Sequence, residues 1–548
     1  MAEVYERVYR RTNFSFKNNG KDYSDQVVNI NFTYNLKEFN NIGADTYVRF
    51  GYNGRNCTFE DGVCIKDDLL VAIKTNIEIE NPIADKYLGA AFSFENGRYR
   101  KRKIKTLYTV AKLRELLYKE GFDFNGIHFR RFKRSSGSSR VGKCLFINEK
   151  LYPRMEKWSA CGIKINEGDP LDLASWEAYT SLTLSSIIDT LEINKENILV
   201  IDDYESVFTD RVVATEIVGN ELVTSEKEVE IGNSIWDGQS AMDISIFGKY
   251  HKKGMLLLRN RFFKSACFNT NIQRWFVDNE ITDISQLNGF TLAKDVSQIK
   301  LITTPSSIKY LKFGKIEDWL NQLDSLFGVV KYDKPTGRFK GKQVQIHYQL
   351  LNTLQLSKDD VRELLKPTFD FLEAIKDEPA VLKHYIQYPE HKEFQETEIR
   401  DKNEIIYNML AVNRRFFETK LYHDFKVDLL KSQIKAIRCG HVFVKGNYST
   451  LFGNPLEMLQ QAIGKFTGES QMGIGNIYNT MFDFDQTLLG SRSPHIANSA
   501  SLLAYNKKNE MIERYFHFTK ELVAVNSIGE NLLERLSGAD QIQGLPIW

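Results

Sequence analysis

The chain has 548 residues and a formal net charge of +2, and 42% of its residues are hydrophobic and 26% charged. This composition is typical of a soluble globular protein and excludes a disordered or fibrous chain. The length predicts several domains with buried cores. No apolar run approaches the ~18 residues of a membrane-spanning helix, so we expect no membrane partner.

The N-terminus and the cysteines indicate a cytoplasmic protein. Residues 1–16 are charged and aromatic, without the apolar centre of a signal peptide. The six cysteines form no Cys-x-x-Cys pair, which predicts neither a disulfide framework nor a zinc ribbon. We therefore expect the reducing cytoplasm.

Residues 1–200 are predicted to form a mixed α/β region that contains a strongly basic segment. Between Arg98 and Lys143, fifteen Lys or Arg residues stand against three acids, a net charge of +12, and aromatic residues are interleaved. Such a segment can follow a phosphate backbone while its rings stack on bases. The alternative is a solvated basic surface. The candidates for contact with nucleic acid are Arg130, Arg131, Lys133, Arg134, Arg140 and Lys143.

A glycine-rich stretch from Gly137 to Cys144 nearly matches the phosphate-binding pattern G-x-x-x-x-G-K-[ST]. However, Cys144 replaces the metal-binding hydroxyl, and the preceding residues are basic instead of an apolar strand. The residues after Lys143 indicate a strand where that motif needs a helix. The pattern therefore favours a basic loop that touches nucleic-acid phosphates over a nucleotide-dependent ATPase.

The rest of the sequence divides by periodicity into three regions. Residues 201–315 contain closely spaced short strands, as in a compact β-barrel. Residues 316–435 have the apolar period of helices and are predicted as a helical insert. Strand-like patterns return in residues 436–548. The sequence therefore predicts an α+β protein with two strand-rich domains.

Two lysines of the first strand-rich region are candidates for phosphate chemistry. Lys253 stands in Lys-Gly-Met, and Lys264 ends the run Leu-Arg-Asn-Arg-Phe-Phe-Lys. Cations on short strands can stabilise the charge that develops on a triphosphate during phosphoryl transfer. Exposed basic strand ends would give the same pattern, so these residues alone leave both interpretations open.

The order of these motifs resembles the two-barrel RNA polymerases, and most of all the phage-type single-chain enzymes related to silencing RNA-dependent RNA polymerases. Lys253 and Lys264 resemble the lysines of their first double-psi β-barrel, although the two are closer together here. The turn Ser491-Arg492-Ser493-Pro494 resembles the Arg-Ala-Pro turn of the second barrel. The resemblance implies two double-psi β-barrels, a nucleic-acid template and ribonucleoside triphosphates. It also implies that Arg492 senses the ribose 2′-hydroxyl.

The metal-binding loop implied by this resemblance departs from the family pattern. Gly538-Ala539-Asp540 resembles the start of the D-x-D-x-D loop, whose alternating aspartates hold catalytic Mg²⁺, but Ile542 and Gly544 occupy the next two positions. One carboxylate is too few to hold magnesium. The pair Asp483 and Asp485 comes before the arginine turn and fits a surface turn better than a substitute metal site. We therefore expect a second barrel that is incomplete and truncated at the metal loop.

Two principal hypotheses follow. The first is an RNA polymerase-like, Mg²⁺-dependent nucleotidyltransferase that acts on ribonucleoside triphosphates and a nucleic-acid template, and that is inactive as this chain because carboxylates are missing. The second is a non-catalytic nucleic-acid-binding protein whose working surface is the basic segment at residues 98–143. An ATPase built on the glycine-rich stretch is a third and weaker hypothesis.

Overall fold

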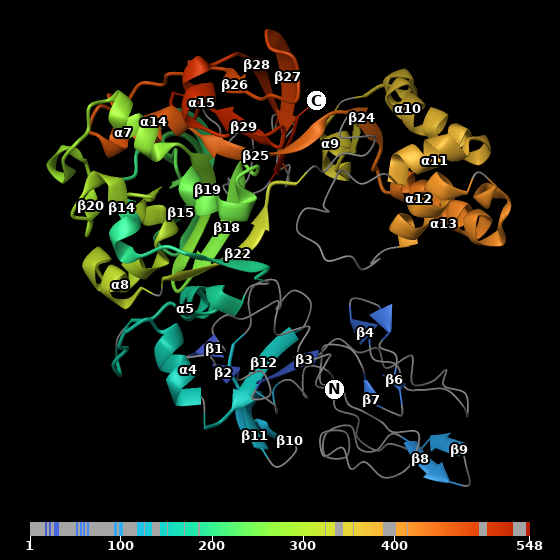
Figure 1. Cartoon of the computed structure of the whole chain (residues 1–548), viewed down its shortest axis with the longest axis horizontal. Helices are drawn as coiled ribbons and strands as arrows, with labels where there is room; N and C mark the ends of the chain where they lie inside the picture. The colour runs from blue at the N-terminus through green and yellow to red at the C-terminus, as the bar shows by residue number, and fades with distance from the viewer. Residues whose placement is uncertain are drawn as a thin grey trace. The chain divides into compact units, whose positions relative to one another are not determined.

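The computed structural model describes residues 143–334, 343–386, 402–492 and 501–529, except for residues 151, 169, 185–186, 324, 355 and 414. It also describes short segments between residues 17 and 133 and the strand at residues 544–547. The chain forms two compact units, drawn in Figure 1. Unit 1 comprises residues 1–195, 257–265 and 308–331, and unit 2 comprises residues 196–256, 266–307 and 332–548.

Unit 1 contains an antiparallel sheet in the order β10-β11-β12-β3. Its strands are β10 (Phe122–Phe124), β11 (Ile127–Arg131), β12 (Lys143–Asn148) and β3 (Val27–Asn31). The prediction of a strand directly after the glycine-rich stretch is confirmed by β12. Because a nucleotide-binding loop of that pattern leads into a helix, β12 argues against the ATPase hypothesis.

The rest of unit 1 consists of helices and a second group of strands. Helices α4 (Tyr152–Ser159) and α5 (Leu173–Thr180) follow β12. Strand β13 (Asp189–Glu192) pairs antiparallel with β22 (Leu326–Tyr332), which follows helix α8 (Ile316–Gln322). The start of the predicted helical insert at residues 316–435 thus consists of one short helix and a strand.

The same sheet includes β18 (Met255–Asn260), whose first two residues belong to unit 2 and the rest to unit 1, and β19 (Phe263–Thr270), whose residues from Ala266 onward belong to unit 2. In unit 2, β19 pairs in parallel with β17 (Gln239–Asp243), and β17 pairs antiparallel with β21 (Leu301–Thr303). All residues of β17 and β21 are buried, so these central strands carry the core of the first barrel-like sheet. Next to β21 lies β14 (Ile198–Val200), which is parallel to it, and β20 (Phe290–Thr291) pairs antiparallel with β14 and forms one edge of the sheet.

Six further strands of unit 2 close into a barrel in the order β25-β29-β26-β28-β27-β30. They are β25 (Asn447–Gly453), β26 (Asn476–Tyr478), β27 (Gln486–Ser491), β28 (Ser501–Asn506), β29 (Leu522–Val525) and β30 (Gly544–Ile547). Strand β30 closes the ring because it pairs with both β25 and β27. The sequence predicted an incomplete second barrel, whereas the ring of strands is complete. The closing strand is short and contains Pro546, which weakens its sequence signal.

The two strand systems of unit 2 share a packed seam. The rings of Phe268 on β19 and Phe452 on β25 stack with centroids 3.8 Å apart and planes 3° apart. Next to them, the Gln239 side-chain amide donates to the Gly453 carbonyl (2.6 Å), and the Gly453 N–H donates back to Gln239 Oε1 (3.0 Å). This reciprocal pair of hydrogen bonds fixes β17 against β25, and the stacked rings exclude water beside it.

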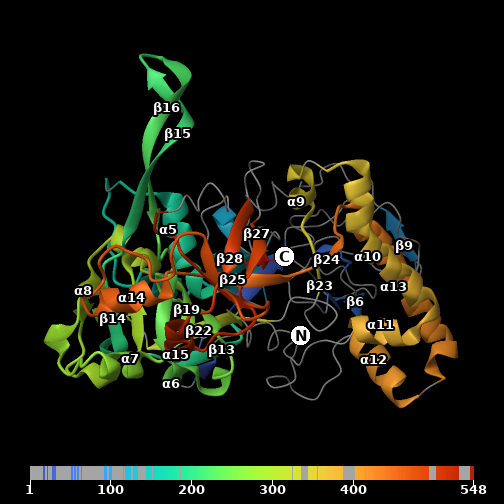
Figure 2. The ribbon, with the colours of Figure 1, turned by 90° about the horizontal axis from the view of Figure 1, so that it is seen from above.

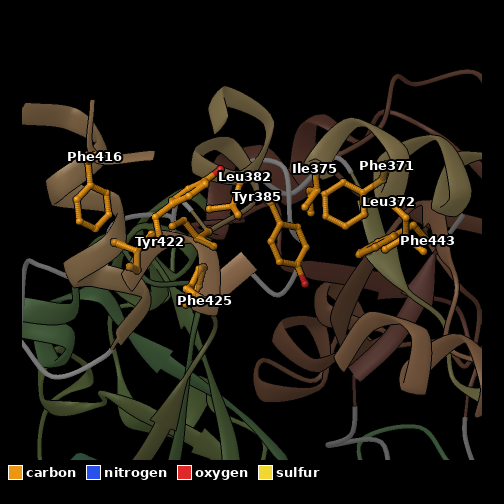
Figure 3. Close-up of a cluster of buried hydrophobic side chains, with 11 residues drawn as sticks. Phe371, Leu372, Ile375, Leu382, Tyr385, Phe416, Tyr422, Phe425 and Phe443 are labelled. Carbon is orange, nitrogen blue, oxygen red and sulfur yellow. The ribbon is translucent and has the colours of Figure 1, made fainter. Parts of the chain in front are cut away.

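Helices of unit 2 form a separate group with its own core. They are α9 (Tyr348–Thr353), α10 (Lys358–Asp377), α11 (Pro379–Ile386), α12 (Lys402–Val412) and α13 (Lys420–Arg438). Strands β23 (Gln343–Gln345) and β24 (Phe443–Lys445) pair where the chain enters and leaves this group. Figure 3 shows the core, in which Phe371, Tyr385 and Phe443 pack together. The described helices of this group thus lie between residues 348 and 438, whereas the sequence predicted a helical insert at residues 316–435.

The remaining elements are short, apart from one hairpin. The hairpin consists of β15 (Glu205–Val218) and β16 (Glu221–Ser234). The short helices of unit 2 are α6 (Ile244–Phe247), α7 (Ile272–Asp278), α14 (Pro455–Ala462) and α15 (Glu510–Tyr515). Short antiparallel pairs near the N-terminus are β1 (Lys17–Asn18) with β2 (Lys21–Asp22), β4 (Gly51–Tyr52) with β5 (Arg55–Asn56), β6 (Phe59–Glu60) with β7 (Val63–Cys64), and β8 (Phe92–Glu95) with β9 (Arg98–Lys101). Within the described part of the chain, no helix is long and apolar enough to cross a membrane.

The seam predicts a stability effect of Phe268→Ala. Because Phe268 is fully buried and stacked, we expect its truncation to lower the free energy of unfolding by about 3–5 kcal/mol. Phe417→Ala is the matched control, since that ring is 45% exposed, and it should cost less than about 1 kcal/mol. Urea unfolding followed by tryptophan fluorescence measures both. Equal costs for the two variants would show that the seam does not contribute as described.

Candidate functional site

The basic segment contributes two arginines at the end of β11 in unit 1. Arg130 is exposed, and its guanidinium lies 4.3 Å from the centroid of the Tyr152 ring. Arg131 is half-buried and forms an ion pair of 3.3 Å with Glu177, while its guanidinium lies 4.6 Å from the Tyr118 ring. Arg130 thus keeps a charge that a phosphate can reach, whereas the charge of Arg131 is already matched within unit 1.

Lys133 is buried, with 6% of its surface exposed. Burial lowers the pKa of its ammonium, and the nearby carboxylates of Glu177 and Glu156 oppose that shift. Its carbonyl accepts a hydrogen bond from the Cys144 thiol of β12. These contacts favour a structural role for Lys133 over direct contact with nucleic acid. Among the other predicted residues of this segment, Lys143 begins β12, and Arg134 and Arg140 lie outside the described residues.

Lys253 lies in the turn that leads into β18, in unit 2. Its N–H donates to the Tyr250 carbonyl (2.7 Å), and its own carbonyl accepts from the Asn269 side chain (2.8 Å). The Lys253 side chain is half-buried, and its ammonium lies 5.2 Å from the centroid of the Tyr332 ring. Backbone bonds and a cation–π contact therefore hold this lysine in one place.

A second lysine lies on the same ring. The ammonium of Lys334 is 4.6 Å from the centroid of Tyr332, and burial together with the charge of Lys253 lowers the pKa of Lys334. Two ammonium groups that share one aromatic ring form a local positive site. Sequence reasoning missed Lys334, because in the sequence it is one of several lysines in a polar loop.

Two carboxyl groups stand beside this pair of lysines. Asp333 is buried, and its carboxylate accepts hydrogen bonds from the Met255 N–H (2.9 Å) and from the Thr519 hydroxyl (2.7 Å). Burial raises the pKa of Glu521, Asp333 raises it further, and Lys253 opposes the shift. The lysines and carboxyls come from segments far apart in the sequence, so this charge cluster exists only in the folded chain.

Lys264 occupies the second position of β19 and is half-buried between Phe263 and Ser265, which are both buried. Near the other end of β19, the Asn269 N–H donates to the carbonyl of Gly254, the neighbour of Lys253. Five residues of a strand span about 16 Å, so Lys253 and Lys264 stand at opposite ends of β19. The close sequence spacing of the two lysines thus does not make them neighbours.

Arg492 directly follows β27 of the closed barrel and is 4% exposed. The residues after it in the predicted arginine turn, Ser493 and Pro494, lie outside the described residues, as does Asp540. The burial of Arg492 fits a side chain that is held by the barrel wall. Its predicted contact with a ribose hydroxyl stays a prediction.

No group of three or more His, Cys, Asp or Glu residues could hold a metal ion within the described ranges. Asp483 and Asp485 are exposed in the loop between β26 and β27, and Asp485 accepts from the Tyr505 hydroxyl (3.2 Å). Their placement matches the surface-turn interpretation. The described donor set does not fit a catalytic Mg²⁺ ion, which needs several convergent oxygen ligands.

Chemically, unit 2 therefore offers cations without a described metal site. Lys253 and Lys334 can bind phosphate oxygens as point charges, with Tyr332 as a platform. Asp333 and Glu521 balance part of this charge.

Comparisons with known proteins bear on the fold. No protein-family model matches the sequence, and no curated protein matches it. Among solved structures, the chain is similar to the RNA-dependent RNA polymerase QDE-1 from Thielavia terrestris, with a TM-score of 0.50 and 14% sequence identity. The match covers 79% of this chain and 45% of that polymerase, so the chain spans less than half the length of its structural neighbour. The chain thus has an α+β, double-psi β-barrel-like fold similar to that of this RNA-dependent RNA polymerase, as the resemblance in the sequence predicted.

Proposed function

We propose that this chain is an RNA polymerase-like nucleotidyltransferase that binds ribonucleoside triphosphates and a nucleic-acid template. The observation that carries the proposal is the fold that this chain shares with an RNA-dependent RNA polymerase. In this chain, lysines lie at the strands of the first barrel-like sheet. The net charge of +2 neither supports nor opposes binding to nucleic acid or nucleotides.

In this proposal the lysines bind the triphosphate. Lys253 and Lys334 present two ammonium groups on one aromatic ring, and phosphate oxygens can bridge them. Lys264, on β19 in unit 1, is not part of this pair. Positive charges fixed in advance stabilise the negative charge of phosphoryl transfer without reorganisation. Arg492, held at the end of β27, discriminates ribose from deoxyribose.

We further propose that the chain joins no nucleotides by itself. Catalytic Mg²⁺ would supply Lewis-acid stabilisation for phosphoryl transfer, and it would need several carboxylates of this chain to hold it. Asp540 is followed at alternate positions by Ile542 and Gly544, and the described residues add no substitute cluster of carboxylates. The residues of this chain then bind and orient nucleotide and template, and the carboxylates for metal chemistry are missing from that loop.

The test is the affinity for a ribonucleoside triphosphate. We expect Lys253→Ala and Lys334→Ala each to weaken binding about tenfold, because each removes one charge-assisted contact to phosphate. Isothermal titration of the full chain with a non-hydrolysable ribonucleoside triphosphate measures the dissociation constant.

Lys358→Ala is the matched control, because Lys358 is an exposed lysine at the start of α10 in the helical group. It should leave the affinity unchanged. If Lys253→Ala and Lys334→Ala bind as tightly as the control, the proposed nucleotide site is wrong.

The second candidate is a non-catalytic nucleic-acid-binding protein that uses the basic segment, and the exposed guanidinium of Arg130 favours it. Here we expect Arg130→Ala to weaken the binding of a single-stranded RNA oligonucleotide about threefold to tenfold without loss of stability. By contrast, Lys133→Ala should lower the melting temperature, because Lys133 is buried. Fluorescence anisotropy and thermal unfolding separate these effects.

Arg362→Ala, which removes an exposed arginine from α10, controls for the lost charge. If the Arg130 and Arg362 variants bind RNA with equal affinity, the basic segment is not the RNA-binding surface. RNA binding that depends on Arg130 while triphosphate binding ignores both lysines would favour the second candidate over the first.

A further inference from the structure

The hairpin β15–β16 has a feature that the proposed function does not use. Its strands pair without interruption from Glu205 opposite Ser234 to Val218 opposite Glu221. Gly219 is the first residue of the two-residue turn and has a φ of +65°. Two-residue hairpin turns need a positive φ at this position, which glycine adopts readily. Fourteen residues of strand span about 45 Å, and Figure 2 shows the two strands extending as a ribbon away from the strands that precede and follow them.

The ribbon has two open edges. Among the described strands, β15 and β16 pair only with each other and form a two-stranded sheet. The outer edge of each strand therefore carries backbone N–H and C=O groups that no neighbouring strand satisfies. A two-stranded hairpin in water is marginally stable alone. A third strand on one edge would both satisfy these groups and stabilise the ribbon.

The charges of the ribbon exclude an anionic partner. From Glu205 to Ser234 there are seven acids and two bases. Both bases are matched within the hairpin, because Arg211 pairs with Glu226 (2.7 Å) and Lys227 pairs with Glu216. Phosphates of nucleic acid or of an anionic membrane would be repelled. The complementary partner is basic.

The alternation of residues along β16 favours the outer edge of this strand as the docking edge, and it favours a partner strand of alternating basic and apolar residues. Glu226, Glu228 and Glu230 are exposed at alternate positions, so their carboxylates line one face of the strand. Val229 and Ile231 are half-buried on the opposite face. A strand added to this edge would place its basic residues beside the carboxylates and its apolar residues beside the valine and isoleucine. The equivalent face of β15 carries Arg211 and is less suited to a basic partner.

Apolar side chains near the turn extend this surface. Ile217 is 75% exposed and lies directly opposite Leu222, which is 74% exposed. Large exposed apolar side chains together at a ribbon tip are typical of a protein contact.

We propose that the outer edge of β16 docks a partner protein, which contributes an extended segment of alternating basic and apolar residues as a third strand. Backbone hydrogen bonds would supply part of the affinity, and the alternation would supply the specificity. This inference does not depend on the proposed nucleotide chemistry, because it uses only the residues of the hairpin.

The test uses the full chain and a fluorescently labelled nine-residue peptide of alternating lysine and valine. We expect saturable binding by anisotropy, and at least tenfold weaker binding of a peptide with the same composition arranged as a lysine block and a valine block. The double variant Glu228→Gln and Glu230→Gln should weaken the alternating peptide about tenfold while leaving the Arg211–Glu226 ion pair intact. Hydrogen exchange should slow across Glu221–Ser234 more than across Glu205–Val218 when the peptide binds.

The matched control is Glu363→Gln with Asp377→Asn, which removes two exposed carboxylates from α10 and should not change peptide affinity. Equal binding of the two peptides, or equal effects of the two double variants, would overturn the proposal. It would also be overturned if replacing Ile217 and Leu222 by serine abolished self-association of the chain or binding to phosphatidylcholine vesicles, since the occupant would then be a second copy or a membrane.

Discussion

The arrangement of unit 2 depends on the seam where β17 meets β25. Gln239 and Gly453 exchange two hydrogen bonds across it, between a side-chain amide and a backbone peptide group. A side chain at position 453 is excluded, since a Cβ there would lie 2.4 Å from the Ile235 carbonyl oxygen. The close approach of the two backbones thus requires glycine.

Neighbouring residues extend this contact into both sheets. The Trp236 indole donates to the carbonyl of Asn454 (3.0 Å), and Asn454 adopts a left-handed conformation with φ +40°. The Asn454 side chain in turn donates to Asn526 (2.9 Å) and accepts from the Ser527 N–H (2.8 Å) beyond the end of β29. One turn therefore ties the first sheet to two strands of the closed barrel. The same barrel also positions the lysine cluster around Tyr332. The Thr519 hydroxyl donates to Asp333, the neighbour of Tyr332, and the segment from Thr519 to Glu521 leads directly into β29.

The sequence was sufficient for the parts of this fold that depend on local pattern. Short alternating runs predicted two strand-rich regions, and the 3.6-residue period predicted the helices around Phe371 and Tyr385. The closing strand β30 was missed because four residues that include Pro546 have no usable periodicity. The burial of Lys133 was missed as well, since its partners Glu156 and Glu177 lie in later helices and only the folded chain brings them close. For the same reason Lys334 could not be recognised beside Lys253.

This chain has an RNA polymerase-like fold, and we propose that its lysines bind nucleotide. We also propose that it lacks two of the three metal-binding carboxylates, because Ile542 and Gly544 follow Asp540 at alternate positions. The most direct measurement is template-dependent primer extension by the purified 548-residue chain, with ribonucleoside triphosphates and Mg²⁺, under conditions where nucleotide binding is first demonstrated. We expect nucleotide to bind and the primer to remain unextended. Robust extension that requires both template and Mg²⁺ would contradict the claim, because a complete metal site would then have to exist within this chain.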